Sequence, residues 1–483
     1  MSTRASTQRT ATDARSVSLV AAEEHRDAVL RLQASYQAIA PGQPVRLGKT
    51  TSNLFRPRRP ATRGLDVSGL GGVLALDPVA RTADVQGMCT YQRLVAATLP
   101  HGLMPLVVPQ LKTITVGGAV TGLGIESTSF RHGLPHESVL EMEVLTGAGE
   151  IVLANAKNEH AELFATMPNS YGALGYTTRI RLELQPIGPV VATTILGYAD
   201  LDAALATIGQ ICADGSHDGQ RVDALDGVLF GPHDVRLVLA RFEAGTESPV
   251  SDYTGQAIYY RSLQNRRSDR LSAAGYLWRW DTDWFWCSEA FGAQHPVIRR
   301  LWPRRWRRSD VYHRLLGLEH RYGVAARVDA ARGLPPRERL VQDVEIPLER
   351  TAEFLRWYCE HVPLRPAWLC PLRLRDRGAA EPTPTPTPTW PLYPLQPGRV
   401  YVNVGFWGTV PVPAGARPAD FAANRAVEDA VERHGGHKSL YADVTYDRDR
   451  FDRLYGGAAY DAAKRRYDPE QRLTGRYEKV TAR

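Results

Sequence analysis

The stretch TVGGAVTGLGIESTSFRHG, residues 115–133, is the most informative part of this sequence. Its four glycines lack Cβ atoms, which lets backbone N–H groups approach a phosphate or a flat ring closely. Tight turns alone are the alternative explanation for clustered glycines. Hydroxyl side chains beside the glycines favour a ligand site. The residues concerned are Gly117, Gly118, Gly122 and Gly124, with Thr115, Thr121, Ser127 and Ser129.

Short strand patterns and single helices alternate around this stretch. Strands are predicted over 72–76, 82–85, 139–145, 151–154 and 177–184, and helices over 21–40, 91–99 and 159–166. Irregularly spaced strands with single helices between them fit two small subdomains better than a regular doubly wound sheet. The pattern therefore predicts an α+β fold.

The 483 residues are enough for two or three domains, and the composition changes near Gly188. All ten tryptophans lie between Trp278 and Trp407. Residues 1–17 are polar and predict a disordered tail, and the Pro-Thr repeat 381–390 predicts an exposed, extended loop. A strand over 400–406, a helix over 418–434, a strand over 439–446 and a closing helix within 455–473 are expected after it.

A second polar loop, RLGKTTSNLFR at 46–56, follows a short strand-like run. It offers donors suited to a pyrophosphate, namely Gly48, Lys49, Thr50, Thr51, Ser52 and Asn53. The loop lacks the spacing of a P-loop, and no GxGxxG follows a first strand. A P-loop nucleotidase and a Rossmann dinucleotide site are therefore both unsupported.

Together the two loops resemble the PCMH-type FAD-binding domain of the vanillyl-alcohol-oxidase superfamily, in which the first loop holds the pyrophosphate and a TVGG stretch lines the flavin. Within that superfamily the sequence resembles the FAD-dependent delta(24)-sterol reductases, through residues 124–133, 169–176, 341–347, 366–371 and 440–451. The resemblance implies that FAD contacts Arg46, Gly48, Lys49, Thr50, Thr51, Ser52, Asn53, Pro109, Thr115, Gly117, Gly118, Thr121, Gly122, Gly124, Ile125, Glu126, Ser127, Ser129, His132, Gly133 and Gly175.

The same resemblance implies a domain plan. Residues 18–187 are expected to form the two-subdomain FAD-binding domain, 188–440 an α+β substrate or cap domain, and 441–483 a segment that packs back on the FAD-binding domain. Many relatives attach FAD through a His or Cys of the first loop. Residues 46–56 contain neither, so that FAD is expected to bind non-covalently. A covalent link through His132 is the weaker alternative, because a lone polar-loop His usually forms hydrogen bonds.

The family reaction would reduce an unactivated C=C bond, which requires a positioned acid, because no carbonyl stabilises a carbanion. Asp343 is the first candidate. Asp343 and Glu345 share one face of the predicted strand VQDVEIP, and the resemblance places this strand at the substrate pocket. Tyr441 is the third candidate, with Asp443 and Asn403 ranked below it. An ordinary salt bridge is the competing explanation for Asp343.

Tryptophan and arginine alternate in residues 276–308, a pattern that suits a membrane interface. A buried aromatic core is the main alternative, and a nucleic-acid surface is disfavoured, since no nucleic-acid-binding fold accompanies the segment. The residues on which this hypothesis rests are Trp278, Trp280, Trp284, Trp286, Trp302 and Trp306, with Arg299, Arg300, Arg304, Arg305, Arg307 and Arg308.

These observations favour an NADPH-dependent reductase of a lipid C=C bond. Only six of the 59 basic residues are lysines, and the arginine- and alanine-rich composition is typical of GC-rich bacteria, in which branched acyl chains are common and sterols are unusual. A methylene-branched acyl chain of a phospholipid is therefore the preferred substrate over a sterol side chain. The alternatives are an oxidase or dehydrogenase of an alcohol or sugar and a non-catalytic lipid-binding flavoprotein.

Five scattered cysteines without a CxxC pair indicate neither a disulfide framework nor a metal site. No apolar run is long enough to span a bilayer, and the first residues do not form a secretion signal. A cytoplasmic protein with peripheral contact at the inner face of an anionic membrane is expected. The sequence leaves the oligomeric state open.

Overall fold

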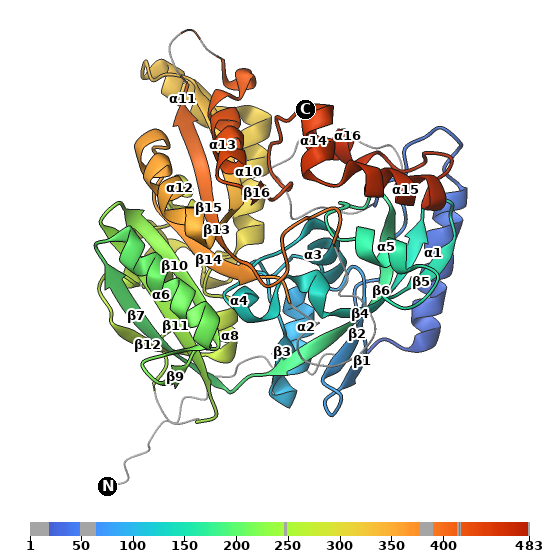
Figure 1. The fold of residues 1–483 in the computed structure, drawn as a ribbon, viewed down its shortest axis with the longest axis horizontal. Helices are drawn as coiled ribbons and strands as arrows, with labels where there is room; N and C mark the ends of the chain where they lie inside the picture. The colour runs from blue at the N-terminus through green and yellow to red at the C-terminus, as the bar shows by residue number, and fades with distance from the viewer. Residues whose placement is uncertain are drawn as a thin grey trace.

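The computed structural model describes residues 19–48, 64–245, 249–375, 390–412, 415 and 417–481. Two antiparallel sheets and their helices make up this part of the chain, and the chain passes from one sheet to the other between Pro186 and Val190 (Figure 1). The mixed architecture confirms the α+β prediction. The Pro-Thr repeat 381–389 and the tail 1–18 lie outside the described residues.

The first sheet, called the N-terminal sheet here, has the order β1-β2-β6-β4-β5, with β3 paired to β6. Its strands are β1 (Val73–Asp77), β2 (Thr82–Gln86), β3 (Leu103–Pro105), β4 (Val139–Thr146), β5 (Ile151–Ala154) and β6 (Gly175–Pro186). Its helices are α1 (Ala22–Gln37), α2 (Tyr91–Thr98), α3 (Val116–Gly122), α4 (Ser129–His132) and α5 (Ala161–Thr166). Each strand predicted in this region overlaps one of these strands.

The second sheet, called the cap sheet here, has the order β12-β7-β11-β10-β14-β15-β13-β16. Its strands are β7 (Val190–Tyr198), β10 (Ala224–Gly231), β11 (Asp234–Glu243), β12 (Ser268–Ser272), β13 (Arg337–Pro347), β14 (Ala367–Arg373), β15 (Val400–Pro411) and β16 (His437–Lys438). A separate pair joins β8 (Ser216–His217) to β9 (Gln220–Arg221).

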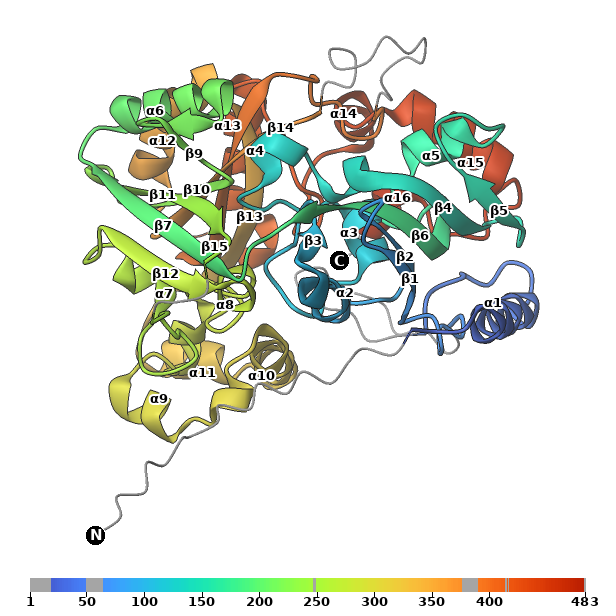
Figure 2. The same cartoon turned by 90° about the horizontal axis from the view of Figure 1, so that it is seen from below.

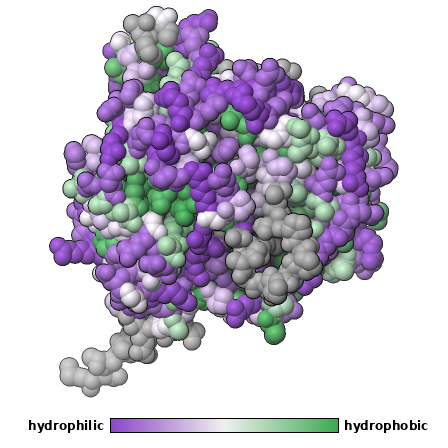
Figure 3. All heavy atoms as spheres, viewed as in Figure 1, coloured by the Kyte–Doolittle hydropathy of each residue, from purple (hydrophilic) through white to green (hydrophobic). Residues whose placement is uncertain are grey.

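Three amphipathic helices cover one face of the cap sheet (Figure 1), namely α6 (Leu201–Asp214), α12 (Leu348–His361) and α13 (Ala422–Arg433). Period-two alternation in β13 directs Leu340, Val344 and Ile346 into this helix-covered core. Asp343 and Glu345 consequently belong to the opposite face of the same strand. The outer side of the helix layer is mostly hydrophilic, with hydrophobic residues gathered in small areas (Figure 3).

The opposite face of the cap sheet packs against residues 259–331, which include the tryptophan-rich segment 276–308 (Figure 2). Its helices are α7 (Tyr259–Ser262), α8 (Ala273–Leu277), α9 (Pro296–Leu301), α10 (Ser309–Tyr322) and α11 (Val324–Ala331). Trp280, Trp284 and Trp286 are buried there, and the Trp280 ring stacks on Phe285 at 4.8 Å. The hypothesis that these three tryptophans face lipid is therefore wrong. Aromatic rings fill the space beneath the sheet, so that most of the segment is core.

The C-terminal helices α14 (Arg448–Leu454), α15 (Gly457–Tyr467) and α16 (Arg476–Thr481) lie beside the N-terminal sheet (Figure 1). The buried Lys464 Nζ donates to the carbonyls of Ala173 and Leu473, at 2.9 and 2.7 Å, and Lys464 also pairs with Asp468 at 2.5 Å. The strand predicted over 439–446 is wrong. Only His437–Lys438 pair with β13, and the chain then leaves the sheet.

One buried ionic cluster joins the glycine-rich stretch to the cap. The Arg279 Nη2 donates to Glu126 at 2.6 Å and to Asp226 of β10 at 2.9 Å, and all three side chains are almost fully buried. The guanidinium also lies 4.0 Å from the Tyr276 ring centroid. Burial raises the pKa of Glu126, Arg279 opposes that shift, and Asp226 adds to it.

Replacing Arg279 by Met should destabilise the protein by about 3–5 kcal/mol, because two buried acids would lose their cation. The matched control is Arg261→Met, which removes an exposed ion pair with Glu289 at 3.4 Å and should cost about 0–1 kcal/mol. Urea unfolding followed by tryptophan fluorescence measures both effects. Equal unfolding midpoints for the two variants would contradict the role assigned to the cluster.

Candidate active site

The glycine-rich stretch forms the turn into α3. The Thr115 side chain caps this helix by accepting a hydrogen bond from the Gly118 N–H at 3.2 Å. Gly117 is buried, and a Cβ there would lie 2.6 Å from the Gly87 carbonyl oxygen, which already accepts the Gly117 N–H. Gly118, in contrast, is exposed, and a Cβ there would meet only Thr115. Packing thus explains Gly117, whereas Gly118 borders open space.

Several of the other predicted cofactor glycines have close protein neighbours. A Cβ at Gly124 would lie 3.0 Å from Pro109, and one at Gly175 would lie 2.5 Å from Val144. Gly133 has a positive φ of 68°, and the Glu137 side chain leaves no room for a Cβ there. Gly122 is half-buried beside Tyr171, whose hydroxyl donates to the Gly122 carbonyl at 2.9 Å. Close packing therefore accounts for Gly124, Gly133 and Gly175, while Gly122 stays near the open side.

The polar side chains after Gly124 point into the protein. Ser127 Oγ donates to Glu126 at 2.8 Å, and Ser129 Oγ accepts the Glu126 backbone N–H at 3.1 Å. Ile125 is buried as well. His132 Nε2 lies 2.9 Å from Gln185 Oε1, and burial lowers the pKa of His132 to about 4, so that its ring is neutral near pH 7.

The predicted pyrophosphate loop is described only at its start. Gly48 is exposed and packs against Gly64, and Arg46 is half-buried. The prediction for Lys49, Thr50, Thr51, Ser52 and Asn53 falls outside the described residues. Contact of this loop with a cofactor accordingly stays a prediction.

The open side of the stretch fits FAD. Gly118 is exposed, and Thr115, Thr121 and Gly122 are half-buried, in a part of the chain that is otherwise closely packed. The hydroxyl of the neighbouring Thr113 is buried and has no hydrogen-bond partner among the described residues. Accessible glycine backbone and an unsatisfied hydroxyl suit a flat, polar cofactor.

Asp343 lies at the centre of a second group of polar side chains, which the cap sheet and the segment after it provide. Its carboxyl accepts hydrogen bonds from Asn403 Nδ2 at 3.0 Å and from the Tyr441 hydroxyl at 2.7 Å. The Tyr441 hydroxyl in turn accepts from Trp407 Nε1 at 2.7 Å. Asp343 pairs with Gly405 across the sheet, and a Cβ at Gly405 would lie 2.4 Å from Asp343 Oδ1. A glycine is therefore needed opposite this carboxyl.

Burial raises the pKa of Asp343 to about 6, while the hydrogen bonds from Asn403 and Tyr441 oppose the increase. The side chain nevertheless stays half-buried rather than enclosed. No basic side chain pairs with Asp343 among the described residues, in contrast to the salt bridge considered as its competing explanation. A carboxyl with these properties can hold a proton near neutral pH and release it.

Glu345 and Tyr441, the other two catalytic candidates, differ in exposure. Glu345 is fully buried, accepts from Ser439 Oγ at 3.0 Å, and has a pKa well above its usual range because of burial and the nearby Asp343. Tyr441 is half-buried, and burial next to Asp343 raises its pKa as well. Glu345 thus stays protonated behind Asp343, whereas Tyr441 contacts Asp343 directly.

Of the two lower-ranked candidates, Asn403 donates to Asp343, whereas Asp443 has a structural role, as has Cys370. Asp443 forms an ion pair with Arg339 at 2.8 Å, and it does not contact Asp343 among the described interactions. Cys370 is buried, and burial raises its pKa well above the usual range, so that it is a neutral thiol. Cys370 belongs to the hydrophobic core that includes Trp280 and Trp368.

Sequence reasoning missed Tyr171 and Gly405. Tyr171 has an unusual φ of 53°, bonds to Gly122, and is close enough to raise the pKa of Tyr441. Its hydroxyl therefore joins it to the glycine-rich stretch. The alternation of Asn403, Gly405 and Trp407 in VNVGFWG was an available signal for one strand face. Nothing in the local sequence marks the positive φ of Tyr171.

Residues 21–155 match the family of the FAD binding domain. The Delta(24)-sterol reductase of Arabidopsis thaliana is 22% identical over 443 residues, covering 83% of this chain and 74% of that protein. The Homo sapiens Delta(24)-sterol reductase is 23% identical over 434 residues, covering 84% and 76%. Cytokinin dehydrogenase 7 of Oryza sativa subsp. japonica is 35% identical over 118 residues, covering 24% and 22%.

The chain therefore contains a PCMH-type FAD binding domain, as the sequence predicted, within an FAD-binding oxidoreductase. It is a homologue of the Delta(24)-sterol reductases along most of its length. When bound, FAD supplies hydride chemistry. The exposed backbone near Gly118 is the part of α3 available to hold this cofactor.

Replacing Gly118 by Val should abolish FAD retention, because the branched side chain would occupy the open side of α3, and should cost about 1 kcal/mol of stability, because its Cβ would lie 2.8 Å from the capping Thr115 Oγ1. Gly231→Val is the control, since a Cβ there has no heavy atom within 4 Å. Flavin absorbance after gel filtration and the unfolding midpoint measure the two effects. A Gly118→Val protein with full flavin content would place the cofactor elsewhere.

Proposed function

We propose that this protein reduces a C=C bond of a lipid, with FAD bound non-covalently and NADPH as the electron donor. The observation that carries the proposal is the half-buried Asp343 carboxyl with its raised pKa, on the face of β13 opposite the helix-covered core, where Asn403 and Tyr441 donate hydrogen bonds to it. The names of the Delta(24)-sterol reductases support the same reaction class.

Asp343 acts as the proton donor in this proposal. Hydride addition to an isolated alkene needs a proton on the other carbon, and Asp343 holds one up to about pH 6. Once the proton has left, the Asn403 amide and the Tyr441 hydroxyl stabilise the resulting carboxylate through the hydrogen bonds they already donate. The cap sheet and the segment that carries Tyr441 therefore surround Asp343 with hydrogen-bond partners both when it is protonated and when it is ionised.

The proposed substrate is a methylene-branched acyl chain of a phospholipid, such as a 10-methylene chain that becomes a 10-methyl chain. Protonation of its terminal methylene carbon develops tertiary cationic character at the branched carbon, where the hydride then adds. A trisubstituted sterol side chain obeys the same logic. The arginine-rich composition, typical of GC-rich bacteria, favours the acyl chain.

Turnover should decrease as pH increases through about 6, by about tenfold per pH unit above it, because only protonated Asp343 can donate. Asp343→Asn should lower the rate about a hundredfold, equivalent to about 3 kcal/mol, and should retain FAD. Rates measured across pH with saturating lipid test both statements. Near-normal turnover by Asp343→Asn would remove the acid role from this residue.

The Tyr441→Phe variant distinguishes between Asp343 and Tyr441 as the proton donor. The variant loses a hydrogen bond that lowers the pKa of Asp343, so that this pKa should increase and the decrease in rate should move to higher pH. Loss of turnover at every pH, with FAD retained, would instead assign the proton to Tyr441.

The reaction itself is tested by anaerobic mixing of the flavin-loaded protein with deuterated NADPH in ordinary water, followed by the methylene-branched phospholipid. The flavin band should bleach with NADPH and return with lipid, and deuterium retained in the product should lie on the branched carbon. Deuterium on the new methyl group would reverse the proposed polarity. Bleaching of the flavin band by an alcohol or sugar but not by NADPH would indicate a dehydrogenase. No bleaching by any of these compounds would indicate a lipid-binding flavoprotein.

A further inference from the structure

We infer that residues 296–306 form a docking surface for an anionic phospholipid bilayer. This surface, called the arginine tip here, belongs to the lobe of α9, α10 and α11 that projects from the cap sheet on the side opposite α6, α12 and α13 (Figure 2). The tip lies outside the candidate active site. Membrane binding and turnover can therefore be measured separately.

The tip exposes large apolar side chains that have no packing role. Val297, Ile298 and Leu301 lie on one side of α9 by helical spacing, and Trp306 follows in the next short turn. Leu301 is 77% exposed and Trp306 is 48% exposed, which is unusual for such large side chains gathered in eleven residues. Apolar side chains on a projecting lobe are suited to enter the boundary between lipid headgroups and acyl chains.

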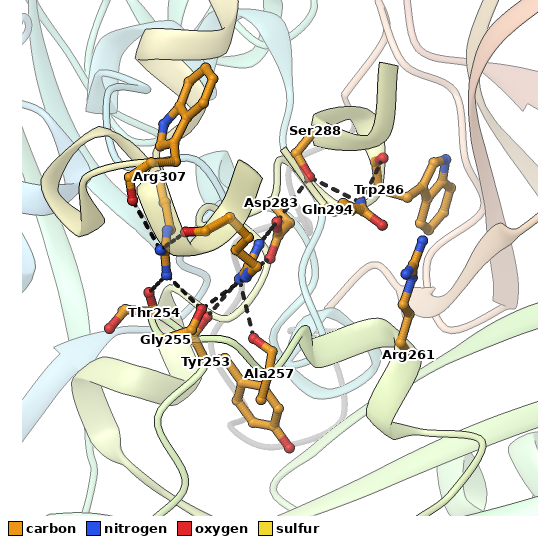
Figure 4. A network of polar contacts seen from close by, with 12 residues as sticks. Tyr253, Thr254, Gly255, Ala257, Arg261, Asp283, Trp286, Ser288, Gln294 and Arg307 are labelled. Atoms are coloured by element: carbon orange, nitrogen blue, oxygen red, sulfur yellow. Dashed lines mark hydrogen bonds and ion pairs between the residues drawn. The ribbon is translucent and has the colours of Figure 1, made fainter. Parts of the chain in front are cut away.

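Two buried arginines hold the tip rigidly on the cap. Arg299 pairs with Asp283 at 2.6 Å and donates to the Gly255 carbonyl at 2.8 Å. Arg307 donates to the carbonyls of Thr254 and Gly255, both at 2.6 Å, and of Trp302 at 2.9 Å (Figure 4). The two arginines of this network are therefore structural. The sequence pattern placed both arginines at a membrane interface, and their burial shows that this prediction is wrong.

The remaining arginines of the tip point outward. Arg300, Arg304 and Arg305 are exposed, and residues 296–306 contain no acidic residue. Arg304 lies 3.3 Å from the exposed Asp252, whereas Arg300 and Arg305 have no acidic partner among the described residues. The Arg305 guanidinium lies 5.8 Å from the Trp306 ring. Cations beside apolar groups complement a surface of lipid phosphates.

The position of the tip supports a bilayer rather than a protein as its occupant. Asp343 belongs to the face of the cap sheet opposite the helix-covered core, the face on which the tip-bearing segment packs. A convex, basic and apolar surface needs no complementary cavity to bind lipid. Protein interfaces of useful affinity require a larger matched area.

The test is co-sedimentation of the flavin-loaded full chain with vesicles of phosphatidylglycerol and phosphatidylcholine, compared with pure phosphatidylcholine. Binding should require the anionic lipid and should weaken as salt increases, since screening acts within about 8 Å at physiological ionic strength. Arg300→Gln with Arg305→Gln should lower affinity about 25-fold, at about fivefold for each arginine. Leu301→Ser should lower it about tenfold.

The controls carry the same changes on exposed residues elsewhere, namely Arg433→Gln with Arg465→Gln, and Leu30→Ser on α1. These variants should bind vesicles as the unaltered protein does. Quenching of Trp306 by brominated lipid, lost in Trp306→Phe, would further support insertion of the tip. Equal binding to neutral vesicles, no binding at all, or equal losses in the control variants would each overturn the inference.

Discussion

The contact between the glycine-rich stretch and the cap sheet depends on the buried cation Arg279. Arg279 of the cap bonds to Glu126 of the glycine-rich stretch and to Asp226 of the cap sheet, and none of the three side chains reaches solvent. Desolvating three charged groups costs several kcal/mol for each ion unless the partners stay in contact. The Trp280 and Trp368 indoles also donate to Asp226, at 3.2 and 3.1 Å. One guanidinium thereby joins the FAD binding domain to the cap sheet, together with the Arg131–Asp223 ion pair at 3.0 Å and a shared hydrophobic core.

That constraint allows a second polar group to form nearby with different properties. Asp343 and Glu345 are two residues apart on one strand face, yet their surroundings separate them. Glu345 is enclosed, and burial raises its pKa well above the usual range, whereas Asp343 is half-buried, has two donors, and has a pKa of about 6. Gly405 makes room for the Asp343 carboxyl. Two neighbouring carboxyl groups with such different pKa values are typical of sites that move protons.

The tryptophan-rich segment shows how one composition serves two environments. Trp280, Trp284 and Trp286 fill the space beneath the cap sheet, and Arg299 and Arg307 satisfy carbonyls and a carboxylate inside it. Only a short part, including Leu301 and Trp306, reaches the surface. Aromatic rings and guanidinium groups pack well in a polar-lined core and also suit a headgroup layer. Composition alone therefore cannot distinguish the two environments.

Local sequence was sufficient to predict much of the secondary structure and part of the candidate site. Period-two alternation was sufficient to place Asp343 and Glu345 on one face of β13, because side-chain direction in a strand follows from the backbone alone. The resemblance of residues 46–56 and 115–133 to the PCMH-type FAD-binding domain was sufficient to predict an FAD binding domain, and the family match over residues 21–155 confirms it. The predicted strand over 439–446 failed, since a run of suitable residues forms a strand only where a sheet edge accepts it, and the chain leaves β13 after Lys438.

The tertiary structure alone decided which residues meet across long sequence separations. Glu126 and Arg279 are 153 residues apart, and Asp343 and Tyr441 are 98 apart. It also decided that Gly117 serves packing while Gly118 borders open space, although the two are adjacent and identical. Burial, partner choice and pKa depend on the summed surroundings of a side chain in three dimensions. A one-dimensional pattern contains the residue types but not their distances, and these distances separate a structural carboxylate from a proton donor.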